Sequence, residues 1–505
     1  MEKEILGKSL IYSFSLYLRL FVKLLSGIFI AKLLGPSLFG LKNAYDLARQ
    51  YESNSDLGVF SALNRLAPYY KGEKDYDKAH TAISSAYSVN LCYAIVAAII
   101  AIIVSRYLKY NGYAQVYVDF VFFFGLMIFT GKLHEYLHTK LRIDHNFYEL
   151  SVNNLIYGLM VSVLGVVFVY FWSFRGLLIS LVITEVVCIG HLMLKEKKLP
   201  KLKISPGSYR TLLKIGFPMM VLFLLLMLLA NADRTLILAM ISEEALGYFG
   251  IATVATGIVA TIPGAIHSVT LTPVMEKLGR TKDFLSIRHY LREPMVIMAY
   301  ILPVLIALIY FAIHLPIKYY LDQYAASISV VKVLVIGIYF QSVSTPVLSV
   351  CLALNKQIHL ICLVIPMVAL NFILNYTFIT AGWGIIGVAA GTSITFFITF
   401  CMLLYFASVQ FGESLQTYLE SLLMIMLPFI YASVLIVGLD TFIDPVIHNI
   451  WFDVMITLIK ITVFMICYSV MLYRIRKHSG FIKLYTNLRL LSDKFFPRGF
   501  KRNHR

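Results

Sequence analysis

Apolar segments of membrane-spanning length alternate with short polar segments along almost the whole chain. Several of them reach the ~20 residues that a helix needs to cross ~30 Å of hydrocarbon. The pattern predicts an all-α polytopic membrane protein with about fourteen transmembrane helices. The predicted spans are 9–33, 38–62, 79–104, 114–137, 150–172, 174–194, 211–238, 246–275, 292–313, 328–352, 357–380, 384–408, 421–439 and 452–474. With 59% hydrophobic and 14% charged residues, the composition excludes an ordinary soluble domain.

The second predicted span, 38–62, is charged along one side. On a helix, spacings of 4, 3, 4 and 3 place five polar residues on one stripe, beside Glu52. These five are Lys42, Asp46, Arg49, Ser53 and Asp56. An isolated charge at the bilayer centre costs at least ~2.5–3.5 kcal/mol, so such residues face a bundle interior or a watery cavity. The stripe predicts a polar pathway. Two alternatives are mutual neutralisation inside a packed bundle, and a soluble loop over 36–80.

Other ionisable residues lie deep in predicted spans. Arg19 and Lys23 share a face of the first span, and Arg19 and Arg49 both fall near the bilayer midplane. Asp233 and Arg234 lie toward the outer end of span 211–238, and Lys460 lies in the middle of the last span. Since carboxylates at this depth often relay ions, Asp46, Asp56 and Asp233 are candidates for ion coupling.

The basic residues are unevenly distributed between the two predicted sides of the membrane. Most of the 44 Lys and Arg residues fall on one side, which the positive-inside rule assigns to the cytoplasm, together with both termini. The net charge of +17 therefore does not indicate nucleic acid. The basic tail, 475–505, carries interleaved aromatic residues and is expected to contact anionic membrane lipids.

The sequence HEYLH at 134–138 matches the His-Glu-x-x-His pattern of zinc proteases. A catalytic zinc needs a third protein ligand, and the sequence offers no convincing one near this helix. An intramembrane zinc protease is thus kept as an alternative, and no metal is predicted. The chain also lacks a glycine-rich loop with a lysine that would cradle ATP phosphates. We expect neither an enzyme nor a cofactor.

Two segments suggest an internal duplication. IFIAKLLGPSLFGLKNAYDLA (28–48) and TLILAMISEEALGYFGIATVA (235–255) each contain a span end, a short turn and a glycine opening the next helix. These glycines are Gly40 and Gly247. The duplication predicts parallel lobes with a central polar cavity between them and alternating access. The predicted organisation is a six-helix lobe at 1–210, a second at 211–410, an extra helix pair at 411–474 and the tail at 475–505.

Four runs resemble a known family: IAKLLGPSLFGLKNAYDL (30–47), DLGVFSALNRLAPYYKGEKDYDKA (56–79), KIGFPMM (214–220) and NADRTLILAMISEEALGYFGIA (231–252). They are similar to polysaccharide-biosynthesis membrane proteins, the Wzx-type flippases of the multidrug/oligosaccharidyl-lipid/polysaccharide (MOP) exporter superfamily. The resemblance implies two six-helix lobes around a cavity, with a final helix pair. It also implies movement of undecaprenyl-diphosphate-linked oligosaccharide from the cytoplasmic to the outer leaflet of the cytoplasmic (inner) membrane, for O-antigen, capsule or exopolysaccharide.

Arg19 and Arg49 are residues of the same type as the cavity arginines of such flippases. The acidic residues of span 38–62 differ from the family pattern, in which the cavity is cationic. The expected partners are the polyprenyl-diphosphate-linked glycan, polysaccharide polymerase and chain-length machinery. Arginine pairs bidentately with diphosphate and lysine adds point charge. The candidate substrate-binding residues are Arg19, Lys23, Lys42, Arg49, Arg234 and Lys460. The alternatives are a multidrug or cation antiporter of the same superfamily, and a scaffold in a glycan-assembly complex.

Overall fold

The structure is a computed structural model. It describes residues 2–144, 146–195, 202–260, 263, 288–353, 357–443 and 449–476. Within these ranges, the side chains of 2–21, 23–24, 288–290, 349–353, 357 and 475–476 are not described. Of the predicted basic tail, residues 477–505 lie outside the described part of the chain.

Every regular element in the described ranges is a helix, as the sequence predicts. Eleven of these helices are long and apolar enough to cross a membrane, and the protein is a multi-pass membrane protein. The helices are α1 (Glu2–Glu52), α2 (Val59–Gly72), α3 (Tyr76–Tyr110), α4 (Gln115–Ile143), α5 (Phe147–Lys195), α6 (Pro206–Met240), α8 (Arg288–Ala312), α9 (His314–Tyr319), η2 (Asp322–Tyr324), α10 (Ser327–Ala353), α11 (Gln357–Thr380), α12 (Gly384–Gln410), α13 (Leu415–Phe442) and α14 (Ile450–Arg476).

Two of the long helices each contain a pair of predicted spans. The backbone of α1 is non-helical at Gly35, and that of α5 at Ser173, where the sequence predicts breaks between successive spans. The predicted span 246–275 is helical over residues 243–260, and most of its remainder lies outside the described part of the chain. These differences account for eleven candidate spans where the sequence predicts about fourteen.

The predicted continuous helix over 38–62 is wrong. α1 ends at Glu52, and a turn over residues 53–58 separates it from α2. Leu57 and Gly58 have φ angles of 55° and 78° in the left-handed region, which ends a right-handed helix. The charged stripe therefore runs along α1 only as far as Arg49, and Asp56 lies in the turn.

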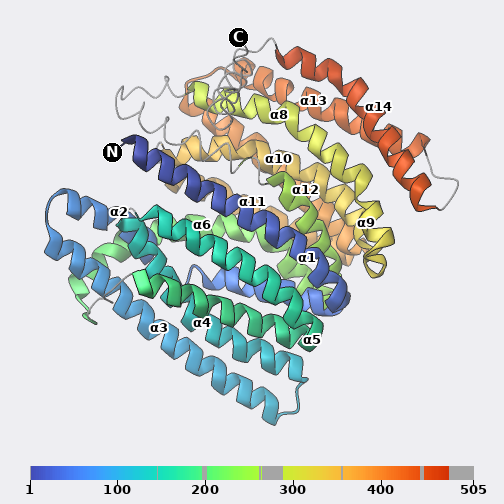
Figure 1. Ribbon diagram of the computed structural model, residues 1–505. Coiled ribbons are helices and arrows are strands. Elements are labelled where there is room, and N and C mark those ends of the chain that lie inside the picture. Colours follow the sequence, from blue (N-terminus) through green and yellow to red (C-terminus); the bar gives the residue numbers. More distant parts are fainter. Residues whose placement is uncertain are drawn as a thin grey trace, which may run out of the picture. The chain divides into compact units, whose positions relative to one another are not determined.

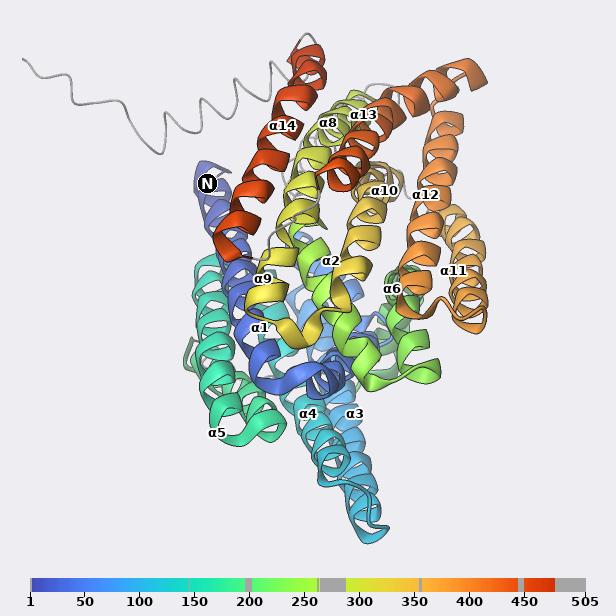
Figure 2. The ribbon, with the colours of Figure 1, turned by 90° about the vertical axis from the view of Figure 1, so that its right-hand side faces the viewer.

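Contacts divide the chain into two compact units, Met1–Gly250 and Ile251–Arg505. In the first, α3, α4 and α5 lie side by side, α1 packs against α5, and α2 packs against α3 and α6 (Figure 1). In the second, α10 packs against α8 and α12, α11 lies beside α12, and α13 and α14 pack on α8 (Figure 2). The lobe boundaries predicted at 210 and 410 remain predictions.

A buried apolar core lies beneath α2 in the first unit. Val59, Leu63 and Ala67 of α2 pack with Leu137 of α4 and Leu212 of α6. This packing fixes the position of α2. The turn at 53–58 is therefore held between α1 and α2.

Candidate functional site

A polar cavity of about 440 Å³ lies within the first unit, between the end of α1, the turn at 53–58, α4 and α5. Its lining includes three bases, four acids and two histidines. The bases are Arg49, Lys132 and Arg142, the acids are Glu52, Asp56, Glu135 and Glu185, and the histidines are His134 and His138. The net charge of this lining therefore depends on how many protons the histidines carry.

The turn at 53–58 gives the cavity one of its walls. Buried Asp56 accepts hydrogen bonds from the backbone N–H groups of Gly58 (3.0 Å) and Phe60 (2.8 Å), and so caps the start of α2. Gly58 lies directly against Gly216 of α6, since a Cβ on Gly58 would lie 2.2 Å from the Gly216 carbonyl oxygen. Interrupted membrane helices of this kind place polar backbone and side chains where they line a cavity.

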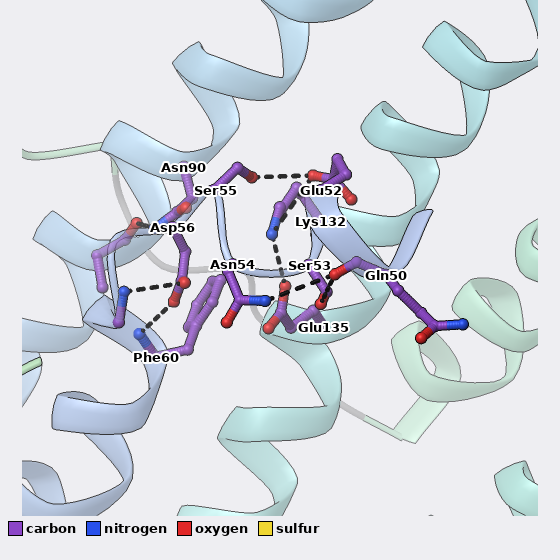
Figure 3. A network of polar contacts seen from close by, with 12 residues as sticks. Gln50, Glu52, Ser53, Asn54, Ser55, Asp56, Phe60, Asn90, Lys132 and Glu135 are labelled. Atoms are coloured by element: carbon purple, nitrogen blue, oxygen red, sulfur yellow. Dashed lines mark hydrogen bonds and ion pairs between the residues drawn. The ribbon is translucent and has the colours of Figure 1, made fainter. Parts of the chain in front are cut away.

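Lys132 of α4 is buried between two carboxylates (Figure 3). Its Nζ lies 3.1 Å from Glu135 and 3.5 Å from Glu52, and Ser55 donates a 3.0 Å hydrogen bond to Glu52. A buried ammonium ion needs such partners because its desolvation is costly. This cluster fixes the end of α1 to α4, and its formal charge of one cation and two carboxylates is −1.

A second cluster centres on Glu185 of α5, whose side chain is only 3% exposed. Arg49 Nη2 lies 3.2 Å from one carboxylate oxygen, and His134 Nδ1 lies 2.7 Å from the other. His134 Nε2 lies 2.9 Å from Asn153 Oδ1. The Arg49 side chain remains 28% exposed, so it can meet a ligand in the cavity while Glu185 holds it in place.

The structure brings only part of the predicted site together. Arg49 and Asp56 line the cavity, together with Glu52. Lys42 and Asp46 form an ion pair of 2.8 Å with each other on α1 and are not among the lining residues. The side chains of Arg19 and Lys23 lie outside the described part of the structure.

Three further predicted residues are placed elsewhere. The carboxylate of Asp233 accepts a 2.7 Å hydrogen bond from the backbone N–H of Arg234, and neither residue is among those lining the cavity. Lys460 belongs to the second unit, where it lies 3.0 Å from Asp440. Lys332 contacts the other oxygen of the same carboxylate at 2.6 Å.

The side chains of His134, Glu135 and His138 in the HEYLH motif contact other residues of the protein. The two ring nitrogens of His134 face Glu185 and Asn153, and Glu135 pairs with Lys132. Arg142 Nη2 lies 3.4 Å from His138 Nδ1. Within the described ranges, no group of three His, Cys, Asp or Glu residues is placed to hold a metal ion.

Sequence reasoning missed Glu185. It is the single acidic residue within the predicted span 174–194, and an intramembrane carboxylate marks a functional position by default. Its isolation in an apolar run was the available signal. Its partners come from α1 and α4, far away in the sequence, so the pairing itself had no sequence signature.

Solved structures of several transporters share this fold. A structure described as lipid II flippase MurJ in an inward closed conformation aligns with a TM-score of 0.70 at 15% identity, over 92% of this chain and 99% of that one. An inward-facing MATE-family multidrug resistance transporter of the MOP superfamily aligns at 0.58 and 14% identity, over 78% and 94%. A MOP transporter from Pyrococcus furiosus, described as having a binding pocket of reversed polarity, aligns at 0.51 and 13% identity, over 81% and 95%.

These likenesses and the helical architecture define the class: the chain has the fold of the MOP superfamily of membrane transporters. A family model described as polysaccharide biosynthesis protein matches residues 29–315, more than half of the chain. The protein belongs to this family of polysaccharide biosynthesis proteins. No curated protein matches the sequence significantly.

Proposed function

We propose that this protein is a flippase that moves a polyprenyl-diphosphate-linked oligosaccharide across the membrane for surface polysaccharide synthesis, as O-antigen, capsule or exopolysaccharide. The observation that carries this proposal is Arg49, held by Glu185 at the edge of a polar cavity inside an apolar helical unit. A diphosphate with attached sugars is hydrophilic, so its passage requires a polar path with hydrogen-bond donors. A guanidinium pairs with phosphate oxygens bidentately.

The membership in a polysaccharide biosynthesis family and the MurJ-like fold support a lipid-linked glycan as substrate. The proposed direction is from the cytoplasmic to the outer leaflet of the cytoplasmic (inner) membrane, with both termini cytoplasmic and lobes at 1–210 and 211–410 alternating in access. The helix pair within 411–474 and the tail at 475–505 would contact lipid. Asp46, Asp56 and Asp233 remain candidates for ion coupling. Polysaccharide polymerase and chain-length machinery are proposed partners.

Replacing Arg49 tests the proposal. In the host, Arg49→Ala should lower surface glycan and raise the lipid-linked precursor, while Arg49→Lys should retain part of the activity because the charge remains. Arg106→Ala, at an exposed position of α3 away from the cavity, is the matched control. Each protein level is measured in isolated membranes. Normal surface glycan with a stable Arg49→Ala protein would contradict the proposal.

A multidrug or cation antiporter is the second candidate. It is favoured by the four carboxylates of the cavity, which outnumber the three bases when both histidines are neutral. A strain lacking the gene should then become sensitive to cationic drugs and keep its surface glycan. If the protein is a flippase, the same strain should lose its surface glycan and keep its resistance to cationic drugs.

A further inference from the structure

His134 has an acceptor against each of its two ring nitrogens. Nδ1 faces Glu185 Oε2 at 2.7 Å, and Nε2 faces Asn153 Oδ1 at 2.9 Å. The orientation of the Asn153 amide is fixed independently, because its Nδ2 donates a 3.0 Å hydrogen bond to the Cys188 carbonyl oxygen. Rotating the amide to offer an N–H to His134 would place two carbonyl oxygens against each other.

A neutral imidazole has one donor and one acceptor nitrogen, whereas an imidazolium has two donors. Two acceptors therefore match the protonated ring. Arg49 contacts the other oxygen of Glu185 and thereby keeps that carboxylate ionised, so the shared proton lies on the ring. We propose that His134 carries a proton as part of the anion site at Arg49, so that an anionic substrate and a proton bind the cavity together.

This inference rests on the proposed function, in which the ligand at Arg49 is a diphosphate. With His134 protonated, Glu185 is shared by two cations and the cluster has one net positive charge. Without that proton, Arg49 and Glu185 neutralise each other and the attraction for an anion is lost. A charge change at a distance of about 10 Å in a partly solvated cavity changes anion affinity by roughly tenfold.

The surroundings of His134 contain other charged groups. Arg49 comes from α1, and Glu185 and Tyr157 come from α5, with the Tyr157 ring stacked 6.2 Å from the imidazole. On α4 itself, the His138 ring lies 6.2 Å away and the Lys132–Glu135 pair is adjacent. Beyond Asn153 lies His191, which faces Glu149 at 3.5 Å, and Glu149 in turn pairs with Lys195.

His138 differs from His134 in its partner. Its Nδ1 lies 3.4 Å from the Arg142 guanidinium, which only donates, so a hydrogen bond there requires Nδ1 to accept. The Asn153 amide separates His134 from His191 and does not pass a proton by simple exchange. His134 is 15% exposed, so its proton is expected to exchange through the cavity.

The first experiment measures the ring protons directly. Protein labelled with ¹⁵N-histidine is placed in bilayers, its ring ¹⁵N resonances are recorded from pH 6 to 9, and His134→Gln assigns the signal. At pH 7.5 His134 should hold both ring protons. Glu185→Gln should release the second proton of His134 at this pH. A singly protonated His134 in the unaltered protein at pH 7.5 overturns the inference.

The second experiment measures anion binding with sulfate, a dianion whose charge is constant over this pH range. Sulfate affinity for the purified protein should fall roughly tenfold between pH 6.5 and 9. In His134→Gln it should be weak and independent of pH, while His80→Gln should behave like the unaltered protein.

The outcomes separate the two proposals. If Arg49→Ala abolishes sulfate binding and glycan export while His134→Gln keeps the pH dependence, the proton coupling is wrong and the flippase function stands. If Arg49→Ala changes neither binding nor export, both proposals fail.

Discussion

Gly40 and Gly247 lie against each other's helix so closely that neither position has room for a side chain. A Cβ on Gly40 would lie 1.7 Å from the Glu243 carbonyl oxygen, and a Cβ on Gly247 would lie 1.9 Å from the Pro36 carbonyl oxygen. The contact is reciprocal, since Gly40 and Gly247 are 207 positions apart and so are Pro36 and Glu243. A parallel duplication predicts such a two-fold relation between the two segments.

Alanine at either glycine should destabilise the protein. The added methyl group meets backbone rather than a movable side chain, so the helices must separate, and such overpacking costs about 1–3 kcal/mol. Thermal unfolding of the purified protein in detergent measures the change. Gly190→Ala is the control, because a Cβ there meets nothing within 4 Å. Equal unfolding temperatures for Gly40→Ala and Gly190→Ala would show that the helices are not in close contact.

Substitutions at Asp56 separate its capping role from ion coupling. Its two carboxylate oxygens accept the backbone N–H groups of Gly58 and Phe60, whereas the amide of Asn has one acceptor oxygen and can accept only one of them. We therefore expect Asp56→Ala to lose about 1 kcal/mol of stability, and Asp56→Asn to lose less than that and to keep glycan export. Surface glycan and thermal unfolding are measured together. A stable Asp56→Asn protein without export would instead indicate that the ionisable group itself is required.

The sequence predicts the helical fold well and the site only in part. Long apolar runs determine most spans by length alone, and the breaks near Gly35 and Ser173 follow from short polar or small-residue links. The break at 53–58 was missed because the polar residues there fit helical spacing equally well. Only packing against α6 and the cap by Asp56 decide for a turn.

The sequence alone does not show which residues pair with the charged side chains of the site. Arg49 could be recognised as deep and charged, but its partner Glu185 lies 136 positions away on another helix. His134 stood out as half of a zinc-type pair, yet its two ring nitrogens face Glu185 and Asn153, which lie on either side of the break in α5 at Ser173. A sequence motif shows which side chains share one face of a helix. The residues on the facing helices decide whether those side chains bind a metal or form hydrogen bonds.

Removing Lys132 should be among the more damaging changes in the first unit. Its loss leaves Glu52 and Glu135 without their shared cation, and breaking a buried pair costs about 3–5 kcal/mol. Because Glu135 is about one-third exposed, we expect Lys132→Met to lie near the lower end of this range. Thermal unfolding and the amount of protein in the membrane measure the effect.

A double variant provides the control for Lys132. Lys132→Met combined with Glu135→Gln removes one charge of each sign and should recover part of the lost stability. If the double variant is no more stable than Lys132→Met alone, the carboxylate of Glu135 does not interact with this lysine in the folded protein.

Lys460 is expected to matter less than its depth in the last helix suggests. Asp440 contacts both Lys460 and Lys332, so Lys460→Met leaves the carboxylate paired with Lys332 at 2.6 Å. Asp440→Asn, by contrast, leaves two lysines near each other without a counter-ion and should destabilise the protein more than Lys460→Met does. Thermal unfolding ranks the two variants, and surface glycan is measured beside it. Loss of export in a stable Lys460→Met protein would instead assign this lysine to the substrate path, because pairing with Asp440 alone does not require it.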